Sequence, residues 1–556
     1  MLNQMIKPLS FLTLAAMTAT VACSGPDTKN AELNATALEA IQAESYVEHV
    51  KKLSSDEFEG RKPFTAGDTL TVNYIEQQFI DLGLEPGNGS SYFQAVPMVE
   101  ITSTPTSNSL TLKAANGSVS LNYLDDFVVG SQHQVEAINV EETELVFAGF
   151  GIVAPEYNWN DYEGLDVEGK TVVVMVNDPG HYDRSLFKGE TMTYYGRWTY
   201  KFEEAARQGA TGVLIIHETG AASYGWNVVR TGWTGPQLNL QSPDKGATRA
   251  DFEGWISGES AEKLFQLAGI EEDLIATAKK PGFRPVALGV TTGVSIRNTF
   301  RESTSNNVIG KITGTKRPDE TIIYTAHWDH LGIGEAVDGD SIYNGAIDNA
   351  TGVAALFELA KGFKAADIQP ERSIIFLAVT AEEEGLLGSK YYAENPIYPL
   401  NKTVVNINMD SFHPIGRAND FAVVGLGQSD IDEYVIRAAQ KQGRVVVAGG
   451  NPSAGSFFRS DHFNFVKAGV PALYGGSGKD VIDADPKEIE ATVAGIYARY
   501  HQVSDEYDES WVLDGIIEDI RLLLDIGYTL SMENGFPGWK EGSEFKEIGE
   551  QRLKQN

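Results

Sequence analysis

From residue 306 onward, apolar strand-like segments alternate with amphipathic helical segments, and this alternation restricts the fold of the 556-residue chain more than any other feature. We expect strands at 321–326, 372–380, 403–409, 420–424 and 471–474. We expect helices at 352–363, 431–442, 487–500 and 516–532. Such alternation predicts an α/β fold with a doubly wound, mixed but mostly parallel sheet and helices on both faces.

The region before this alternation has two parts of different character. Apolar positions at helical spacing predict helices within residues 36–84. Between about residue 99 and residue 293, short alternating strands and one helix at 198–208 predict a separate β-rich unit. A chain of 556 residues is also too long for one hydrophobic core, which favours two to four domains.

The charge and the cysteine content limit the partners of the chain. Lys and Arg total 44 and Asp and Glu total 77, which gives a formal net charge of −33. A protein that follows nucleic-acid phosphates needs a basic surface, so we expect no nucleic-acid partner. The single cysteine, Cys23, excludes an internal disulfide and a cysteine-rich metal module.

The first 23 residues have the pattern of an export signal. Lys7 gives a weakly basic start, and the apolar run over 9–22 is too short to form a stable spanning helix. Cys23 after small residues resembles a bacterial lipoprotein box, although Thr20 stands where a larger aliphatic residue is usual. We therefore expect an exported protein of the bacterial cell envelope or periplasm, attached to the membrane only through a lipid on Cys23. Cleavage by a general signal peptidase and secretion is the alternative.

Side chains with metal-binding chemistry follow several of the expected strands and helices. They are His327, Asp329 and His330 after the first strand, Glu382, Glu383 and Glu384 after the second, Asp410 after the third, Asp348 before a helix, and His501 after one. Each alone is an ordinary loop or capping residue. Together they lie where an α/β sheet binds ligands, and imidazole with carboxylate suits zinc and similar ions. Two imidazoles and three carboxylates suffice for two ions if one carboxylate bridges them.

These segments resemble, in the same order, the motifs of M28-type zinc metallopeptidases, an aminopeptidase-like group of enzymes with two zinc ions. The matching segments are HWDH at 327–330, GAIDN at 345–349, EEEGLLGS at 382–389, NMD at 408–410, SDH at 460–462 and YH at 500–501. The resemblance covers about residues 40–100 and 300–530, and it implies the zinc exopeptidase fold.

The resemblance also implies a ligand set for two Zn²⁺ ions per chain. His327 and Asp410 would hold one ion, Glu383 and His501 would hold the other, and Asp348 would bridge both. His330 and His462 resemble family positions near the site, and neither is assigned as a ligand.

Other residues would support the reaction. Glu382 would act as the general base and then as the acid, and Tyr500 would stabilise the oxyanion. Asp329 would accept the free ring N–H of His327 and so fix its tautomer. His330 lies near the site without an assigned role, and Glu384 is expected to be in solvent.

The β-rich stretch resembles, more loosely, the protease-associated (PA) domain that is inserted in such peptidases. It would either cover the active-site entrance or have a purely structural role. The expected organisation is a signal segment at 1–23, a polar tether at 24–40, a split peptidase domain at 41–100 and 300–535, a PA-like insertion at 101–299, and a polar, frayed tail at 536–556.

The function that follows is an exported aminopeptidase that hydrolyses N-terminal residues from peptides with a metal-bridging hydroxide and a Glu general base. A carboxypeptidase for acidic C-termini or a glutaminyl cyclase on the same fold are alternatives. A carboxypeptidase needs a cation for the substrate carboxylate, and Arg459 is the only basic residue that the sequence places near the site. A non-catalytic envelope-binding lipoprotein is a further alternative, and the complete ligand set argues against it.

Overall fold

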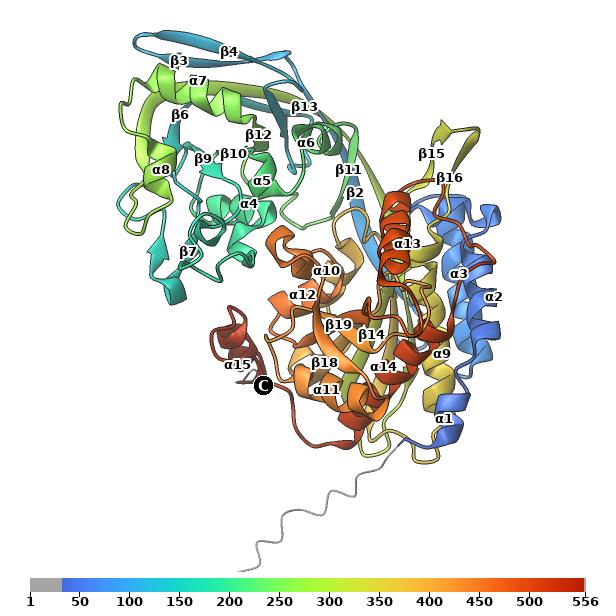
Figure 1. The fold of residues 1–556 in the computed structure, drawn as a ribbon. Coiled ribbons are helices and arrows are strands. Elements are labelled where there is room, and N and C mark those ends of the chain that lie inside the picture. Colours follow the sequence, from blue (N-terminus) through green and yellow to red (C-terminus); the bar gives the residue numbers. More distant parts are fainter. Residues whose placement is uncertain (1–32, 555–556) are drawn as a thin grey trace, which may run out of the picture.

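The computed structural model describes residues 33–554, so the predicted signal segment, Cys23 and the first part of the tether lie outside the described residues. None of the helices within 33–554 combines the length and the apolar character that a membrane span requires. Figure 1 shows two bodies joined by long strands. The lower body contains the helices α1–α3 and α9–α15, of which α13 spans Pro486–Arg499, and the upper body contains α4–α8.

The sheet of the lower body is mixed but mostly parallel. In spatial order its strands are β1 (Glu85–Pro86) and β2 (Phe93–Pro105) along one edge, β13 (Val286–Ile312), β17 (Arg372–Val379), β14 (Arg317–His327), β18 (Thr403–Asn408), β21 (Ala472–Ser477), β19 (Asp420–Val424) and β20 (Val445–Gly449). The central strands β17, β14, β18 and β21 are parallel, whereas β13 and β19 pair antiparallel with the outermost of them.

Alternate residues of the central strands pack against different layers of helices. In β17, Ile374 and Phe376 belong to the larger core, whereas Ile375 and Leu377 face the opposite layer. The helices of the larger core are α1 (Ala35–Glu39), α2 (Ala43–Leu53), α3 (Ala66–Asp81), α9 (Thr351–Lys364), α11 (Ile431–Lys441) and α14 (Asp514–Met532), and those of the opposite layer are α10 (Leu387–Glu394) and α12 (His462–Lys467). Helices on both faces confirm the predicted α/β class.

Two long strands lead from the lower sheet into the upper body (Figure 1). β2 and β13 pair antiparallel without a break from Phe93–Val308 to Pro105–Ile296. The predicted domain limits at 101 and 299 therefore fall inside this strand pair. We call residues 106–295, which lie between the paired segments, the insert.

The insert has hydrophobic cores of its own, built around a small sheet. Its central strands β9 (Thr171–Met175), β10 (Gly212–Ile216) and β12 (Phe252–Ile256) are parallel. The other strands are β3 (Ser109–Ala114), β4 (Gly117–Asn122), β5 (Phe127–Gly130), β6 (Ala137–Phe147), β7 (Val153–Ala154), β8 (Trp159–Asn160) and β11 (Pro236–Leu240). The helices are α4 (Trp198–Arg207), α5 (Thr219–Ala222), α6 (Trp226–Gly232), α7 (Gly258–Ala268) and α8 (Leu274–Ala278).

Both ends of the described chain are more ordered than the sequence pattern predicts. The tether was expected to reach residue 40, but α1 begins at Ala35 and the side chain of Ala37 is fully buried. The expected frayed tail at 536–556 contains α15 (Lys546–Lys554), and Trp539 and Phe545 are buried. The buried Arg552 donates to the carbonyls of Leu400 and Thr403. Polar composition hid these contacts, because only a few residues of each segment reach the core.

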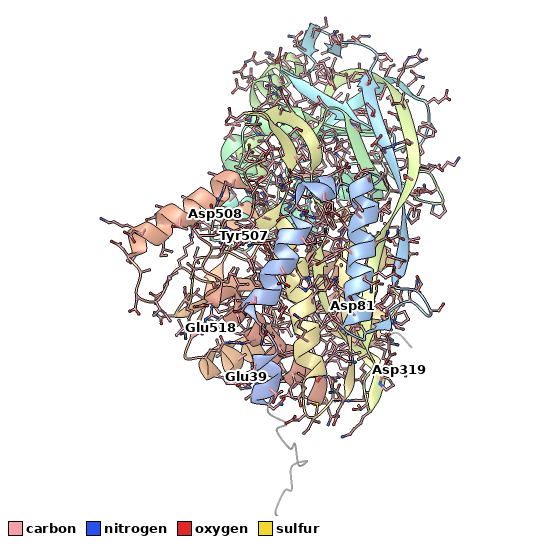
Figure 2. All side chains as sticks on the ribbon, turned by 90° about the vertical axis from the view of Figure 1, so that its right-hand side faces the viewer. Glu39, Asp81, Asp319, Tyr507, Asp508 and Glu518 are labelled. Atoms are coloured by element: carbon pink, nitrogen blue, oxygen red, sulfur yellow. The ribbon has the colours of Figure 1, made fainter. Side chains whose placement is uncertain are left out.

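Most of the acidic excess lies on the surface. In Figure 2, labelled acidic side chains on or near α1, α3, β14 and α14, among them Glu39, Asp81, Asp319 and Glu518, lie at the outside of the lower body. Surface charge of this kind favours solubility and identifies no partner.

Candidate metal centre

Three parallel strands bring the predicted site residues to one edge of the sheet. β14 ends at His327, which is in register with Val379 at the end of β17, three residues before Glu382. Thr325 is in register with Asn408 at the end of β18, two residues before Asp410. Parallel strands end at the same edge, so His327, the Glu382–Glu383 pair and Asp410 lie together there.

Asp348 reaches this edge from a loop. The loop connects the hairpin β15 (Gly332–Val337) and β16 (Asp340–Tyr343) to α9. The two carboxylate oxygens of Asp505 accept hydrogen bonds from the main-chain N–H groups of Ile347 and Asp348, each at 3.0 Å. Asn349 Nδ2 donates to the carbonyl of Met409 at 3.0 Å, which ties the loop to the end of β18. Asp505 thus holds Asp348 in place, a role that the sequence reasoning missed.

Each of two imidazoles faces a pair of carboxylate oxygens. His327 Nε2 lies 3.2 Å from Asp348 Oδ1 and 3.5 Å from Asp410 Oδ1. His501 Nε2 lies 3.4 Å from Asp348 Oδ2 and 2.9 Å from Glu383 Oε2. The five residues of the predicted ligand set therefore form two groups of three ligand atoms, and Asp348 contributes one oxygen to each group.

The ring nitrogens in these groups are not hydrogen-bonded. His327 Nε2 and His501 Nε2 are buried, and neither has a hydrogen-bond partner within residues 33–554. Although burial disfavours a charge on the ring, the carboxylates of Asp348 and Glu383 raise the pKa of His501 to about 10. Carboxylates likewise raise the pKa of His327 well above its ordinary value. The site therefore favours positive charge at these atoms, and its N and O donors fit divalent cations such as zinc.

Glu382 and Tyr500 lie beside the two groups on a cavity of about 650 Å³. Its walls include Asp348, Asp410, Phe412, Tyr474 and Tyr497. Burial and the nearby carboxylates raise the pKa of Glu382 well above its usual value. Tyr500 stacks on the ring of His501 with centroids 3.8 Å apart, and 56% of its surface stays exposed.

Asp329 contacts its neighbours differently from the prediction. His327 Nδ1 lies 3.2 Å from the main-chain oxygen of Asp329, whereas the nearer carboxylate oxygen is 3.9 Å away. The carboxylate instead accepts from the main-chain N–H groups of Glu382 at 3.0 Å and Glu383 at 3.3 Å. The tight turn after β14 turns the main-chain carbonyl, not the side chain, toward the ring. Asp329 therefore orients His327 through its backbone and orients the Glu382–Glu383 segment through its carboxylate.

His330 takes part in the site, although the sequence pattern gave it no role. Its Nδ1 lies 2.6 Å from Glu383 Oε1, the carboxylate oxygen that does not face His501. Ligand atoms of His330, Asp348 and Glu383 lie within 4.8 Å of one another, as do those of His327, Glu382 and Asp410. Glu384 also differs from its expected place in solvent, because its side chain is only 25% exposed and lies 3.7 Å from Lys62 Nζ.

Arg61 connects, through hydrogen bonds, the main-chain segments that carry the site. The residue is 1% exposed, and its guanidinium donates to the carbonyls of Leu53, Trp328, Asn344 and Gly345 at 2.6–2.8 Å. Two of these carbonyls lie in the segment that leads to Asp348, and Trp328 directly follows His327. One buried cation thus connects the loop before α3 to both halves of the candidate metal centre.

The fold and the site define an α/β protein with imidazole and carboxylate ligands gathered at the carboxyl ends of parallel strands. Residues 307–522 match the model of peptidase family M28. The five residues of the predicted ligand set all lie within the matched range.

The chain is also similar in part to curated relatives and to solved structures. The chain is 35% identical over 164 residues to "Aminopeptidase NAALADL1" of Mus musculus, a match that covers 28% of this chain and 20% of the mouse protein. It is 29% identical over 217 residues to a "Probable zinc metalloprotease" of Pyrenophora tritici-repentis, over 33% of this chain and 43% of that protein. The chain thus matches less than half the length of either relative. An aminopeptidase structure from Aneurinibacillus sp. strain AM-1 aligns over 89% of this chain and 94% of that one, with 20% identity and a TM-score of 0.48.

Proposed function

We propose that this protein is a zinc-dependent aminopeptidase that releases N-terminal residues from peptides. One observation carries the proposal: two buried imidazole nitrogens each face two carboxylate oxygens without a hydrogen bond, as metal ligands do around a shared ion. The match of residues 307–522 to peptidase family M28 and the names of the relatives support peptide hydrolysis and zinc.

The chain offers ligands for two ions. His327 and Asp410 would hold one ion, Glu383 and His501 would hold the other, and Asp348 would contribute an oxygen to each. When bound, such ions polarise a carbonyl group and lower the pKa of water.

The remaining residues would move protons and bind the substrate. Glu382 would take a proton from the attacking water and then give it to the leaving amine, and burial of its carboxyl group suits it to hold that proton. Tyr500, on the same cavity, would donate a hydrogen bond to the oxygen that becomes negative in the tetrahedral state.

The Glu382→Gln variant tests this assignment. We expect its zinc content to match the wild type, while turnover of an aminoacyl-nitroanilide falls by roughly 10²–10⁴-fold, because the amide cannot accept the proton. Glu384→Gln is the matched control, since that neighbouring side chain points toward Lys62. Full activity of Glu382→Gln would remove this residue from the mechanism.

A substrate panel separates the proposed activity from its rivals. An aminopeptidase cleaves peptides with a free N-terminus and spares N-blocked ones. A carboxypeptidase cleaves N-blocked peptides as well, provided that their acidic C-terminus is free. A chelator abolishes either activity. Cyclisation of N-terminal glutamine would indicate a glutaminyl cyclase. No chelator-sensitive turnover of any substrate would favour a binding protein.

We also propose that the chain is exported and acylated at Cys23, and that the insert is a PA-like domain at the entrance of the site. The supporting observations are the apolar run before Cys23 and the contact of the insert with the loops around the cavity. Mass spectrometry of the mature N-terminus in wild type and Cys23→Ser tests the acylation.

A further inference from the structure

Arg459 lies on the cavity wall close to the candidate metal centre. The next residue, Ser460, donates from Oγ to Asp410 Oδ2 at 2.6 Å, so the backbone of Arg459 is fixed near a predicted metal ligand. The guanidinium is exposed on the cavity, and its Nε and Nη2 donate to the carbonyl of Ala454 at 3.1 and 2.8 Å. Those bonds orient the group, and no acceptor for Nη1 is found among the described residues, so Nη1 can bind a ligand.

A second arginine, Arg197 of the insert, packs on the loop that precedes Arg459. Arg197 directly precedes α4, which lies on the side of the insert that faces α10 and α12 (Figure 1). The main-chain N–H of Met192 donates to the carbonyl of Pro452 at 3.0 Å, which holds this part of the insert against the loop before Arg459. Gly455 has a φ of +68°, and a Cβ there would lie 3.3 Å from Arg197 Cδ, so the side chain packs directly on that loop.

Neither arginine has an acidic partner in the described part of the chain. Within residues 33–554, no carboxylate forms an ion pair with Arg197 or Arg459, and nothing accepts a hydrogen bond from the side chain of Arg197. Burial, together with the charge of Arg459, lowers the pKa of Arg197 to about 10, and only tyrosine hydroxyls oppose that shift. The chain has 77 acidic and 44 basic residues, so carboxylates are plentiful as partners for arginine. Two neighbouring guanidinium groups without a carboxylate partner among the described residues therefore suggest that an anion binds between them.

We propose that Arg197 and Arg459 form a subsite that binds a carboxylate of the substrate. The inference rests on the proposed peptidase function and narrows its substrates to peptides with a carboxylate near the scissile bond. Guanidinium groups bind carboxylates through paired, charge-assisted hydrogen bonds, and two of them together can bind both oxygens. The carboxylate is either the C-terminal α-carboxylate of a short peptide or an acidic side chain. Because one arginine comes from each body, the insert contributes directly to substrate selection.

The test uses two matched pairs of tripeptides with free N-termini. The first pair is Leu-Ala-Ala as the free acid and as the C-terminal amide. The second is Leu-Asp-Ala amide and Leu-Asn-Ala amide. The ratio of kcat/KM within each pair is measured for wild type, Arg197→Met, Arg459→Met and the control Arg184→Met, an exposed arginine of the insert that pairs with Glu190.

We expect the wild type to prefer the charged member of one pair by about 10- to 100-fold, and each of the two arginine variants to lose most of that preference. Preference in the first pair identifies the α-carboxylate, and preference in the second identifies the side chain. Arg184→Met should keep the ratio of the wild type. Ratios near one in wild type, or ratios unchanged in both arginine variants, would overturn the subsite.

Failure of the peptidase function would look different. If no tripeptide is hydrolysed, the proposed function fails, and the subsite is then tested by calorimetric titration of the same four peptides onto the protein. Tighter binding of a charged member that is lost in Arg197→Met and Arg459→Met supports the subsite. Equal affinities within both pairs contradict it.

Discussion

His330 Nδ1 lies 2.6 Å from Oε1 of Glu383, and the other oxygen of that carboxylate lies 2.9 Å from His501 Nε2. His330 is buried, so the bond fixes the plane of a predicted metal ligand. We expect His330→Ala to lower the affinity for the ion that Glu383 and His501 would hold by about 10- to 100-fold, a typical effect of losing such a partner. Competition with a chromophoric chelator measures this affinity.

His330→Asn offers a conservative comparison, because its amide retains a donor, and it should recover part of the lost affinity. Circular dichroism shows whether both variants are folded. Wild-type metal affinity in folded His330→Ala would contradict the positioning role.

His501→Ala should lose about one of two metal ions per chain, because the ring supplies one of the three ligand atoms in its group. Elemental analysis of the purified protein measures the stoichiometry. His413→Ala is the control, since His413 lines the same cavity outside both groups and should leave the metal content unchanged. Retention of both ions in His501→Ala would mean that this ring is not a ligand.

Arg61→Met should destabilise the protein by about 3–5 kcal/mol, because the carbonyls of Leu53, Trp328, Asn344 and Gly345 would lose a buried charged donor. Arg61→Lys should recover only part of this, since one ammonium group cannot match the planar fork. Urea unfolding measures the change, and metal content reports whether the site loosens. A loss below about 1 kcal/mol would show that the connection is dispensable.

Glu544 predicts a pH dependence of stability. Its side chain is 3% exposed, and burial raises its pKa to about 7, although Lys188 at 3.8 Å and the main-chain N–H of Tyr194 act in the opposite direction. Because the pKa is higher in the folded than in the unfolded state, its contribution to stability is complete below about pH 4.5 and is lost as the pH rises through 7.

Glu544→Gln should therefore be more stable than the wild type at pH 8.5, by at most about 3 kcal/mol, and similar to it at pH 4.5. Urea midpoints at the two pH values measure the difference. Glu541→Gln is the control, because its side chain is 90% exposed. An equal effect of both substitutions, or no dependence on pH, would contradict burial of an ionisable carboxyl group.

The sequence predicted the lower body well because its signals are local. Strands expected at 403–409 and 420–424 correspond to β18 (Thr403–Asn408) and β19 (Asp420–Val424), and continuous apolar runs are typical of strands buried on both faces. The residues after β14, β17 and β18 could also be grouped, since parallel strands necessarily end at the same edge.

Contacts that depend on the direction of a side chain could not be predicted from the sequence. The pattern HWDH does not show whether the carbonyl or the carboxylate of Asp329 meets His327, because the turn after β14 decides it. Arg197 and Arg459 are separated by 262 positions and meet only because the insert packs on the Pro452–Gly455 loop. The helix α15 was missed because most of its surface is polar, while a few side chains such as Arg552 anchor it.

In topological terms, the paired strands β2 and β13 form a hairpin, and the insert takes the place of its loop. Gln94 and Asn307 are direct partners in that ladder, where a two-residue turn of the Asn-Gly type could connect the strands. The strand order of the lower sheet does not depend on what lies beyond that point. The insert could thus be lengthened, replaced or deleted in evolution without a change in the strand order of the sheet that carries the metal ligands. Substrate choice and chemistry can therefore evolve separately.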